Sequence, residues 1–168
     1  MLNKLKAIIA TFILTVCLAA TASAQQDFTL VSPDGQNITL SGLRGKVVVL
    51  LFGGIQDPQC RDEFKALESL AERYRDKDVH IYWVSVNPVK DVPDAQLKNP
   101  CGPTGSVVVL RDATQTAFKR YSGKVAQLPT IVVLNQQGEL YGQPRGGFNP
   151  NSDFVNDLAA AIDRLLKK

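Results

Sequence analysis

The chain has 168 residues, of which 45% are hydrophobic and 21% are charged, and these proportions are typical of one globular domain with a single core. The formal net charge of +3 is small and spread along the chain. Because a nucleic-acid-binding protein needs a basic face, we expect no nucleic-acid partner.

The N-terminal residues have the pattern of a secretory signal peptide. Lys4 and Lys6 precede an apolar run over residues 7–20, which is too short for a membrane-spanning helix. Ala22-Ser23-Ala24 matches the small-residue cleavage site that follows such a run. We therefore predict a signal peptide over residues 1–24.

Cys17 offers a second interpretation of this leader. A lipidated cysteine would attach the protein to a membrane, and we expect membrane binding only in that case. Val16 precedes the cysteine, at a position where a lipobox usually has a small residue. We expect ordinary cleavage instead, with a mature domain over residues 25–168 in a bacterial periplasm or outside the cell.

The mature sequence alternates between segments typical of strands and segments typical of helices. The expected strands cover residues 45–52, 79–86, 107–110 and 130–134. The expected helices cover residues 58–77 and 113–121, with a C-terminal helix from Asn151 or Ser152 through Leu165. Apolar residues at helical spacing predict the buried face of the first helix: Phe64, Leu67, Leu70, Ala71 and Tyr74. Residues 87–105 are rich in Pro, Asn, Asp and Gly, which predicts an irregular segment.

The first of these strands runs through a tight turn into a helix that carries a cysteine near its start. Asp57-Pro58-Gln59-Cys60 spans this junction. A cysteine at a helix N-terminus after a buried strand is the layout of a thioredoxin-type Cys-x-x-Cys site. Asp57 stands at the position where the first of the two cysteines is required.

Three separated stretches resemble the TlpA-like branch of the thioredoxin superfamily, which overlaps the AhpC/TSA redoxin pattern. They are the segment from Asp27 to Lys46, Cys60-Arg61-Asp62-Glu63-Phe64, and Leu128-Pro129-Thr130. These stretches are similar to the family's N-terminal hairpin, the start of its active-site helix and its cis-proline loop. The resemblance implies an α/β, thioredoxin-like fold: a central mixed sheet flanked by helices, with an N-terminal hairpin and a TlpA-type insertion over residues 87–105. It also implies thiol–disulfide oxidoreductase chemistry, with an incomplete pair of cysteines.

Two interpretations of Asp57 are open. Asp is among the best N-cap residues and Pro is favoured at the first helical position, so Asp57 and Pro58 are explained as a helix start. Alternatively, the Asp57 carboxylate has a catalytic role. It keeps a negative charge at this position but cannot form the mixed disulfide that an attacking cysteine forms. We favour the capping interpretation.

Cys60 is the candidate catalytic residue, at the position of the family's buried resolving cysteine. A neighbouring carboxylate opposes ionisation of its thiol and favours an inert role, whereas the helix N-terminus favours a redox-active thiolate. Cys101 is the other cysteine of the expected mature chain. The two form a disulfide only if their Cα atoms lie within about 7 Å of each other. The sequence leaves this pairing open against two separate buried thiols.

Leu128 and Pro129 are the candidate substrate-binding residues. In the TlpA-like family that this sequence resembles, the loop with the cis-proline lies opposite the active-site turn and pairs with an extended peptide. Such recognition does not need the missing cysteine. The sequence therefore predicts either an oxidoreductase that acts through Cys60, alone or with Cys101, or a non-catalytic peptide-binding module that uses the groove between residues 56–60 and Leu128-Pro129.

No cofactor or metal is expected. Copper chaperones of the same fold bind their metal through two cysteines and a distant histidine, but here the first cysteine is replaced. The single histidine, His80, opens a predicted strand, where we expect an edge or surface position. A haem attachment motif is also absent from the sequence.

Overall fold

The computed structural model describes residues 27–125, 127–149 and 153–167. The predicted signal peptide, Cys17 and the predicted helix cap at Asn151 or Ser152 lie outside these residues.

The described residues form one seven-stranded mixed sheet with the order β2-β1-β5-β4-β3-β6-β7. Its strands are β1 (Thr29–Val31), β2 (Asn37–Thr39), β3 (Val47–Gly53), β4 (Val79–Ser85), β5 (Val108–Arg111), β6 (Thr130–Leu134) and β7 (Arg145–Gly146). β3, β4 and β5 run parallel, whereas β6 is antiparallel to β3. β1 and β2 form the predicted N-terminal hairpin. Hydrophobic residues fill β3 and β6 because both faces of these inner strands are covered.

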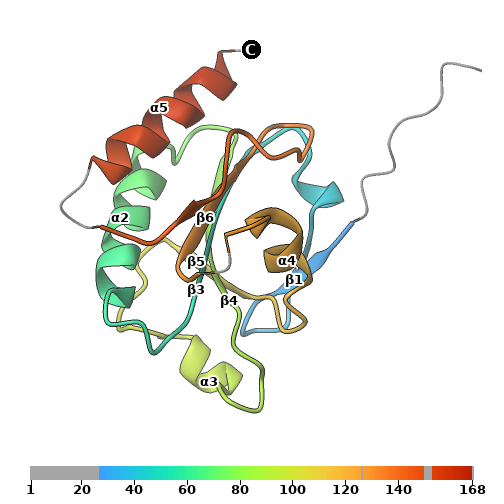
Figure 1. Cartoon of the computed structure of the whole chain (residues 1–168), viewed down its shortest axis with the longest axis vertical. Coiled ribbons are helices and arrows are strands. Elements are labelled where there is room, and N and C mark those ends of the chain that lie inside the picture. Colours follow the sequence, from blue (N-terminus) through green and yellow to red (C-terminus); the bar gives the residue numbers. More distant parts are fainter. Residues whose placement is uncertain (1–26, 126, 150–152, 168) are drawn as a thin grey trace, which may run out of the picture.

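Helices cover both faces of this sheet. They are η2 (Ser41–Leu43), α2 (Cys60–Arg73), α3 (Asp94–Leu97), α4 (Thr116–Ser122) and α5 (Phe154–Leu166). α2 and α5 pack side by side on one face, and α4 lies on the other (Figure 1). Alternate residues of β3 separate accordingly: Val49 and Leu51 belong to the core under α2 and α5, and Leu50 and Phe52 to the core on the other face.

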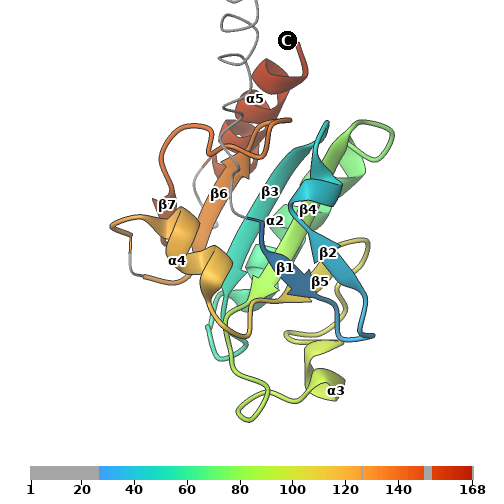
Figure 2. The same cartoon turned by 90° about the vertical axis from the view of Figure 1, so that its right-hand side faces the viewer.

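The strand ends define the place of the candidate site. Phe52 near the end of β3 pairs with Thr130 at the start of β6, and Gly53 pairs with Ser85 at the end of β4. The turn after β3, the insertion after β4 and the loop before β6 therefore meet at one edge of the sheet. Figure 2 shows that α3 and the loops on either side of it extend outward from this edge. In open α/β sheets, ligands bind outside the carboxyl ends of the parallel strands.

The predicted elements are confirmed with shifted ends. α2 begins two residues later and ends four residues earlier than its predicted span of 58–77. α4 begins at Thr116 instead of residue 113, because the buried Asp112 carboxylate accepts hydrogen bonds from the backbone of Thr116 and Phe118 and so starts the helix there. The short helix α3 inside the irregular segment was not predicted.

Candidate functional site

The turn between β3 and α2 is fixed from two sides. Asp57 N–H donates to the Gly54 carbonyl at 3.1 Å, which closes the turn on itself. Ile55 N–H donates to Asn87 Oδ1 at 3.3 Å, which joins the turn to the first residue of the insertion after β4. The loops that follow two adjacent strands therefore support each other.

Asp57 caps a turn that precedes α2. Its Oδ1 accepts a hydrogen bond of 2.9 Å from Gln59 N–H, and its carbonyl accepts one of 3.1 Å from Cys60 N–H. The helix itself begins at Cys60, and Gln59 is its N-cap residue, with no side-chain capping bond. The prediction that Asp57 is the N-cap was therefore wrong by two residues. The reason is that residues 57–60 close as a turn with an i to i+3 bond, in which Pro58 supplies its fixed φ.

Cys60 is joined to Cys101 by a disulfide, with the Cα atoms 5.8 Å apart. Cys60 is the first residue of α2 and is 2% exposed, whereas Cys101 is only half-buried. The loop from α3 to β5, which carries Cys101, passes the first turn of α2 (Figure 1). The structure thus brings together the two cysteines whose pairing the sequence left open.

Gly102 allows the cysteine-bearing loop to lie against α2. Its φ of +106° is one that L side chains rarely adopt, and a Cβ there would lie 3.1 Å from Arg61 Nη2. The Arg61 guanidinium consequently lies beside the residue that follows Cys101. Among the described residues Arg61 makes no ion pair, so its charge faces this loop without a carboxylate partner.

A buried arginine holds the rest of the insertion. Arg111, at the end of β5, donates to the carbonyls of Asn87 and Val92, each at 2.7 Å, and pairs with Asp94 at 2.8 Å. Its guanidinium therefore satisfies groups in the segment that leads into α3 and at the first residue of that helix, as a buried charge requires. Arg111 thus holds the first half of the insertion, and the disulfide joins the second half, which carries Cys101, to α2.

Glu63 is a buried carboxylic acid one helical turn after Cys60. Its Oε2 accepts a hydrogen bond of 2.9 Å from Trp83 Nε1, and its Oε1 has no hydrogen-bond partner. Burial raises the pKa of Glu63 to about 7. The hydrogen bond from Trp83 lowers this pKa, and the charge of Asp57 raises it to a smaller extent. At neutral pH this side chain can therefore hold or release a proton close to the disulfide.

Sequence reasoning missed the role of Glu63 and its contact with Trp83. Residues three apart on a helix lie on the same face. Glu63 follows Cys60 by three residues and precedes Phe64, so it falls within the apolar face of α2. The position of Glu63 within this apolar face was the signal that could have predicted a buried acid.

The Leu128–Pro129 peptide bond is cis, as predicted. The register of β6 with β3 puts it beside the end of β3, at the edge that carries the Asp57 turn. Pro129 is buried and its carbonyl accepts a hydrogen bond of 2.8 Å from Gly147 N–H, whereas Leu128 is 38% exposed. Within the described chain, no hydrogen bond uses the Leu128 backbone.

His80 does not lie at an edge of the sheet. It belongs to β4, an inner strand between β3 and β5, and its ring stacks on Tyr82 with the centroids 5.8 Å apart. Burial lowers its pKa. The expectation of an edge position was wrong because the apolar run after His80 did not reveal how many strands flank it, whereas the side chain is only half-buried and so keeps part of its surface exposed. No cluster of three or more His, Cys, Asp or Glu side chains suited to a metal occurs in the described residues.

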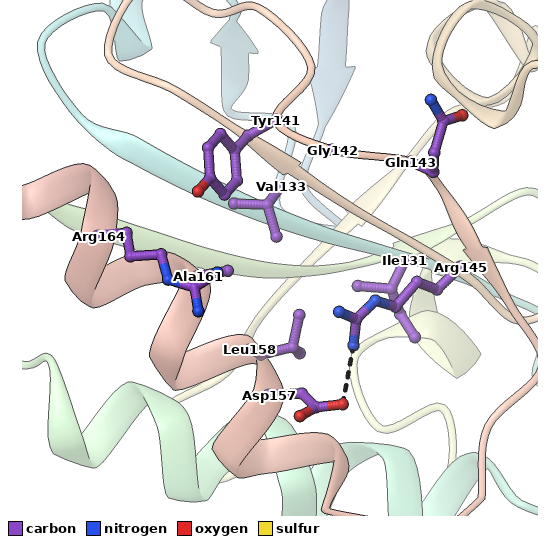
Figure 3. A pocket seen from close by; sticks show the side chains of 10 residues that line it. All are labelled: Ile131, Val133, Tyr141, Gly142, Gln143, Arg145, Asp157, Leu158, Ala161 and Arg164. Atoms are coloured by element: carbon purple, nitrogen blue, oxygen red, sulfur yellow. Dashed lines mark hydrogen bonds and ion pairs between the residues drawn. The ribbon is translucent and has the colours of Figure 1, made fainter.

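A cavity of about 410 Å³ lies between β6, the β6–β7 connection and α5. Ile131, Val133 and Leu158 contribute apolar lining, and Arg145 points toward Asp157, with which it forms an ion pair of 3.2 Å (Figure 3). None of the residues predicted for the site from the sequence lines this cavity. It is separate from the disulfide.

The fold is that of a thioredoxin-like domain, with a disulfide at the start of α2. The family model described as the AhpC/TSA family matches residues 22–142, and the chain belongs to this family.

Two curated relatives and one solved structure show what the chain is similar to. It is 28% identical over 131 residues to the thiol-disulfide oxidoreductase ResA of Halalkalibacterium halodurans, which covers 77% of this chain and 71% of the relative. It is 29% identical over 114 residues to ResA of Bacillus subtilis, covering 68% of this chain but only 61% of the relative, less than two thirds of its length. The exposed lipoprotein thioredoxin of Streptococcus pneumoniae has the same fold, with a TM-score of 0.69 at 22% identity over 83% of this chain and 100% of that one.

None of the helices in the described residues is long and apolar enough to span a membrane.

Proposed function

We propose that this protein is a thiol–disulfide oxidoreductase that acts through Cys60 and Cys101 in place of a Cys-x-x-Cys pair. The observation that carries the proposal is the disulfide between the first residue of α2 and a half-buried loop cysteine, at the edge where β3 and β4 end. The curated relatives named thiol-disulfide oxidoreductase support this class of reaction. The replacement of the family's first cysteine by Asp57 explains why a different partner is required.

The reaction transfers two electrons from a substrate dithiol to the Cys60–Cys101 disulfide. A substrate dithiol attacks the Cys60–Cys101 bond, a mixed disulfide forms, and the second substrate thiol breaks it. The substrate leaves as a disulfide and both protein sulfurs become thiols, with two protons moving from substrate to protein. The reverse sequence reduces a substrate disulfide.

Glu63 supports this exchange as a proton carrier for Cys60. Both side chains belong to the buried face of α2, and Glu63 Oε1 has no hydrogen-bond partner. Because its pKa lies near 7, the acid can accept a proton from the Cys60 thiol or return one to its thiolate without a large free-energy cost.

We place this activity in a bacterial periplasm or outside the cell. The signal-peptide pattern over residues 1–24 supports export, and disulfides persist in such oxidising compartments. Membrane attachment would require lipidation of Cys17, which the residue before it disfavours.

Catalysed reduction of insulin by dithiothreitol tests the proposed function. The mature wild type should exceed the uncatalysed rate, and Cys60→Ser and Cys101→Ser should each return to it, because each removes one half of the pair. Circular dichroism spectra of the variants control for folding. A wild type no faster than dithiothreitol alone, or a Cys101→Ser variant as fast as wild type, contradicts the proposal.

A non-catalytic peptide-binding module is the second candidate function. It is favoured by the exposed Leu128, whose backbone makes no hydrogen bond within the described chain, beside the buried Pro129. An extended peptide can pair with such a backbone, as in added-strand recognition. Calorimetric titration with extended peptides that lack cysteine tests this function. Binding that survives Cys60→Ser and is lost in Leu128→Asp would support it, and no binding would exclude it.

A further inference from the structure

We infer that an incoming thiol attacks Cys101 and that Cys60 is the leaving sulfur, so the loop cysteine, and not the helix cysteine, forms the mixed disulfide. This inference rests on the proposed function and assigns the two sulfurs their roles within it. The assignment reverses the expectation from the sequence, which made Cys60 the candidate catalytic residue.

Access to the two cysteines differs. Cys60 is 2% exposed and belongs to the hydrophobic core under α2 and α5. Cys101 is half-buried and packs against that core from outside, between the half-buried Pro100 and Gly102, and the next residue, Pro103, is exposed. Thiol–disulfide exchange requires in-line approach to the sulfur that is attacked, so the rate depends on access to that sulfur. A substrate thiol therefore reaches Cys101 without opening the core.

The leaving sulfur is favoured on the Cys60 side. The dipole of a helix stabilises a thiolate at its N-terminus, and this offsets part of the cost that burial and the nearby Asp57 carboxylate impose on a Cys60 thiolate. Cys60 is the first residue of the 14-residue helix α2, whereas Cys101 lies in a loop. Exchange is faster when the departing thiolate is the more stable one. Access therefore selects Cys101 as the attacked sulfur, and the helix dipole favours the departure of Cys60.

The positive charge of Arg61 favours the approach of a thiolate to Cys101. Its guanidinium lies beside Gly102, the residue after Cys101, and forms no ion pair within the part of the chain that the structure describes. The attacking species is an anionic thiolate, which a positive charge next to the target sulfur attracts. Arg61 is therefore a positioning residue for the incoming thiolate.

The step balances as follows. The thiolate forms a bond to Cys101 Sγ while the Sγ–Sγ bond to Cys60 breaks, and Cys60 departs with the electron pair and takes up one proton. A second thiol then attacks the substrate sulfur of the mixed disulfide. Cys101 departs as a thiolate and is protonated, and the substrate is released as its disulfide.

Peptide mapping of the mixed disulfide tests the inference. Oxidised wild-type protein is mixed with excess glutathione, quenched in acid after short times, alkylated and mapped by mass spectrometry. We expect at least tenfold more glutathione on Cys101 than on Cys60. Equal labelling, or labelling mainly on Cys60, overturns the assignment but leaves the proposed function standing. If neither cysteine carries glutathione and the disulfide stays intact, both the inference and the proposed function are overturned.

A matched pair of variants tests the role of Arg61. Arg61→Gln should slow reduction by glutathione at least threefold at low salt, with little change for positively charged cysteamine. Lys65→Gln removes the same charge one turn further along α2, from a side chain that is paired with Asp62, and should leave both rates unchanged. An Arg61→Gln variant that reacts with both thiols as wild type does overturns the assignment of Arg61.

Discussion

Trp83 Nε1 donates a hydrogen bond of 2.9 Å to Glu63 Oε2 in the buried layer between α2 and the sheet. The indole has room because position 53 is a glycine: a Cβ on Gly53 would lie 2.9 Å from Trp83 Nε1. Burial raises the pKa of this acid, and only one of its two carboxylate oxygens has a hydrogen-bond partner. This relationship keeps a titratable group next to the cysteine that begins α2.

The free energy of unfolding should depend on pH through Glu63. Its pKa is about 7 in the folded protein against an ordinary value of 4.5, so the folded state binds the proton more tightly. The resulting stabilisation is present below about pH 4.5, is lost as pH rises through about 7, and amounts to about 3 kcal/mol. Glu63→Gln, which keeps an acceptor for Trp83, should remove this slope in urea unfolding.

The exposed Glu72 of α2 provides the control for this experiment. Glu72→Gln should keep the wild-type slope, because the charge of an exposed carboxylate is well solvated. A Glu63→Gln variant whose stability changes with pH as steeply as that of wild type would show that Glu63 titrates normally.

Asp57→Ala should destabilise the protein by about 1 kcal/mol, because it removes the acceptor for Gln59 N–H in the turn before α2. Asp57→Asn should cost little, since the amide oxygen can accept the same bond. Because the charge of Asp57 raises the pKa of Glu63, Asp57→Asn should also lower that pKa. Chemical denaturation measures the first effect, and its pH dependence measures the second. A stabilising Asp57→Ala would instead indicate that the carboxylate is strained there.

Asp57→Cys should increase insulin reduction above the wild-type rate. The substitution recreates a Cys-Pro-Gln-Cys sequence, in which an attacking thiol precedes Cys60 by one turn. Asp57→Ser is the matched control, because it removes the carboxylate without adding a sulfur, and should stay at the wild-type rate. If Asp57→Ser raises the rate as much, the carboxylate itself inhibits the reaction and no thiol is missing.

Once the disulfide is reduced, Cys101 should react with iodoacetamide faster than Cys60 in the native protein. Cys101 is half-buried, whereas Cys60, the first residue of α2, is buried in the core and should become reactive only on unfolding. Mass spectrometry of timed samples, with and without denaturant, separates the two rates. Fast native alkylation of Cys60 would point to a single-cysteine site at the helix.

The sequence was sufficient for the elements around the site but not for their contacts. β3 and β6 are continuous apolar runs, so these strands were predictable from local patterns, whereas the cis bond before Pro129 was implied by the resemblance of Leu128-Pro129-Thr130 to the family's loop. The Cys60–Cys101 disulfide depends on how an irregular segment folds over α2, through Arg111 and Gly102, and local patterns carry no such information. The burial of Glu63 likewise depends on Trp83, a residue from another element.

The reduction potential of the Cys60–Cys101 disulfide tests the central claim most directly. The mature protein is equilibrated in dithiothreitol and glutathione redox buffers, and the free thiols are counted by mass shift with a maleimide reagent. A working redox pair should titrate in one two-electron step with a potential above about −300 mV, and Cys101→Ser should abolish that step. A disulfide that stays oxidised below about −300 mV until the protein unfolds would be structural and would contradict the account.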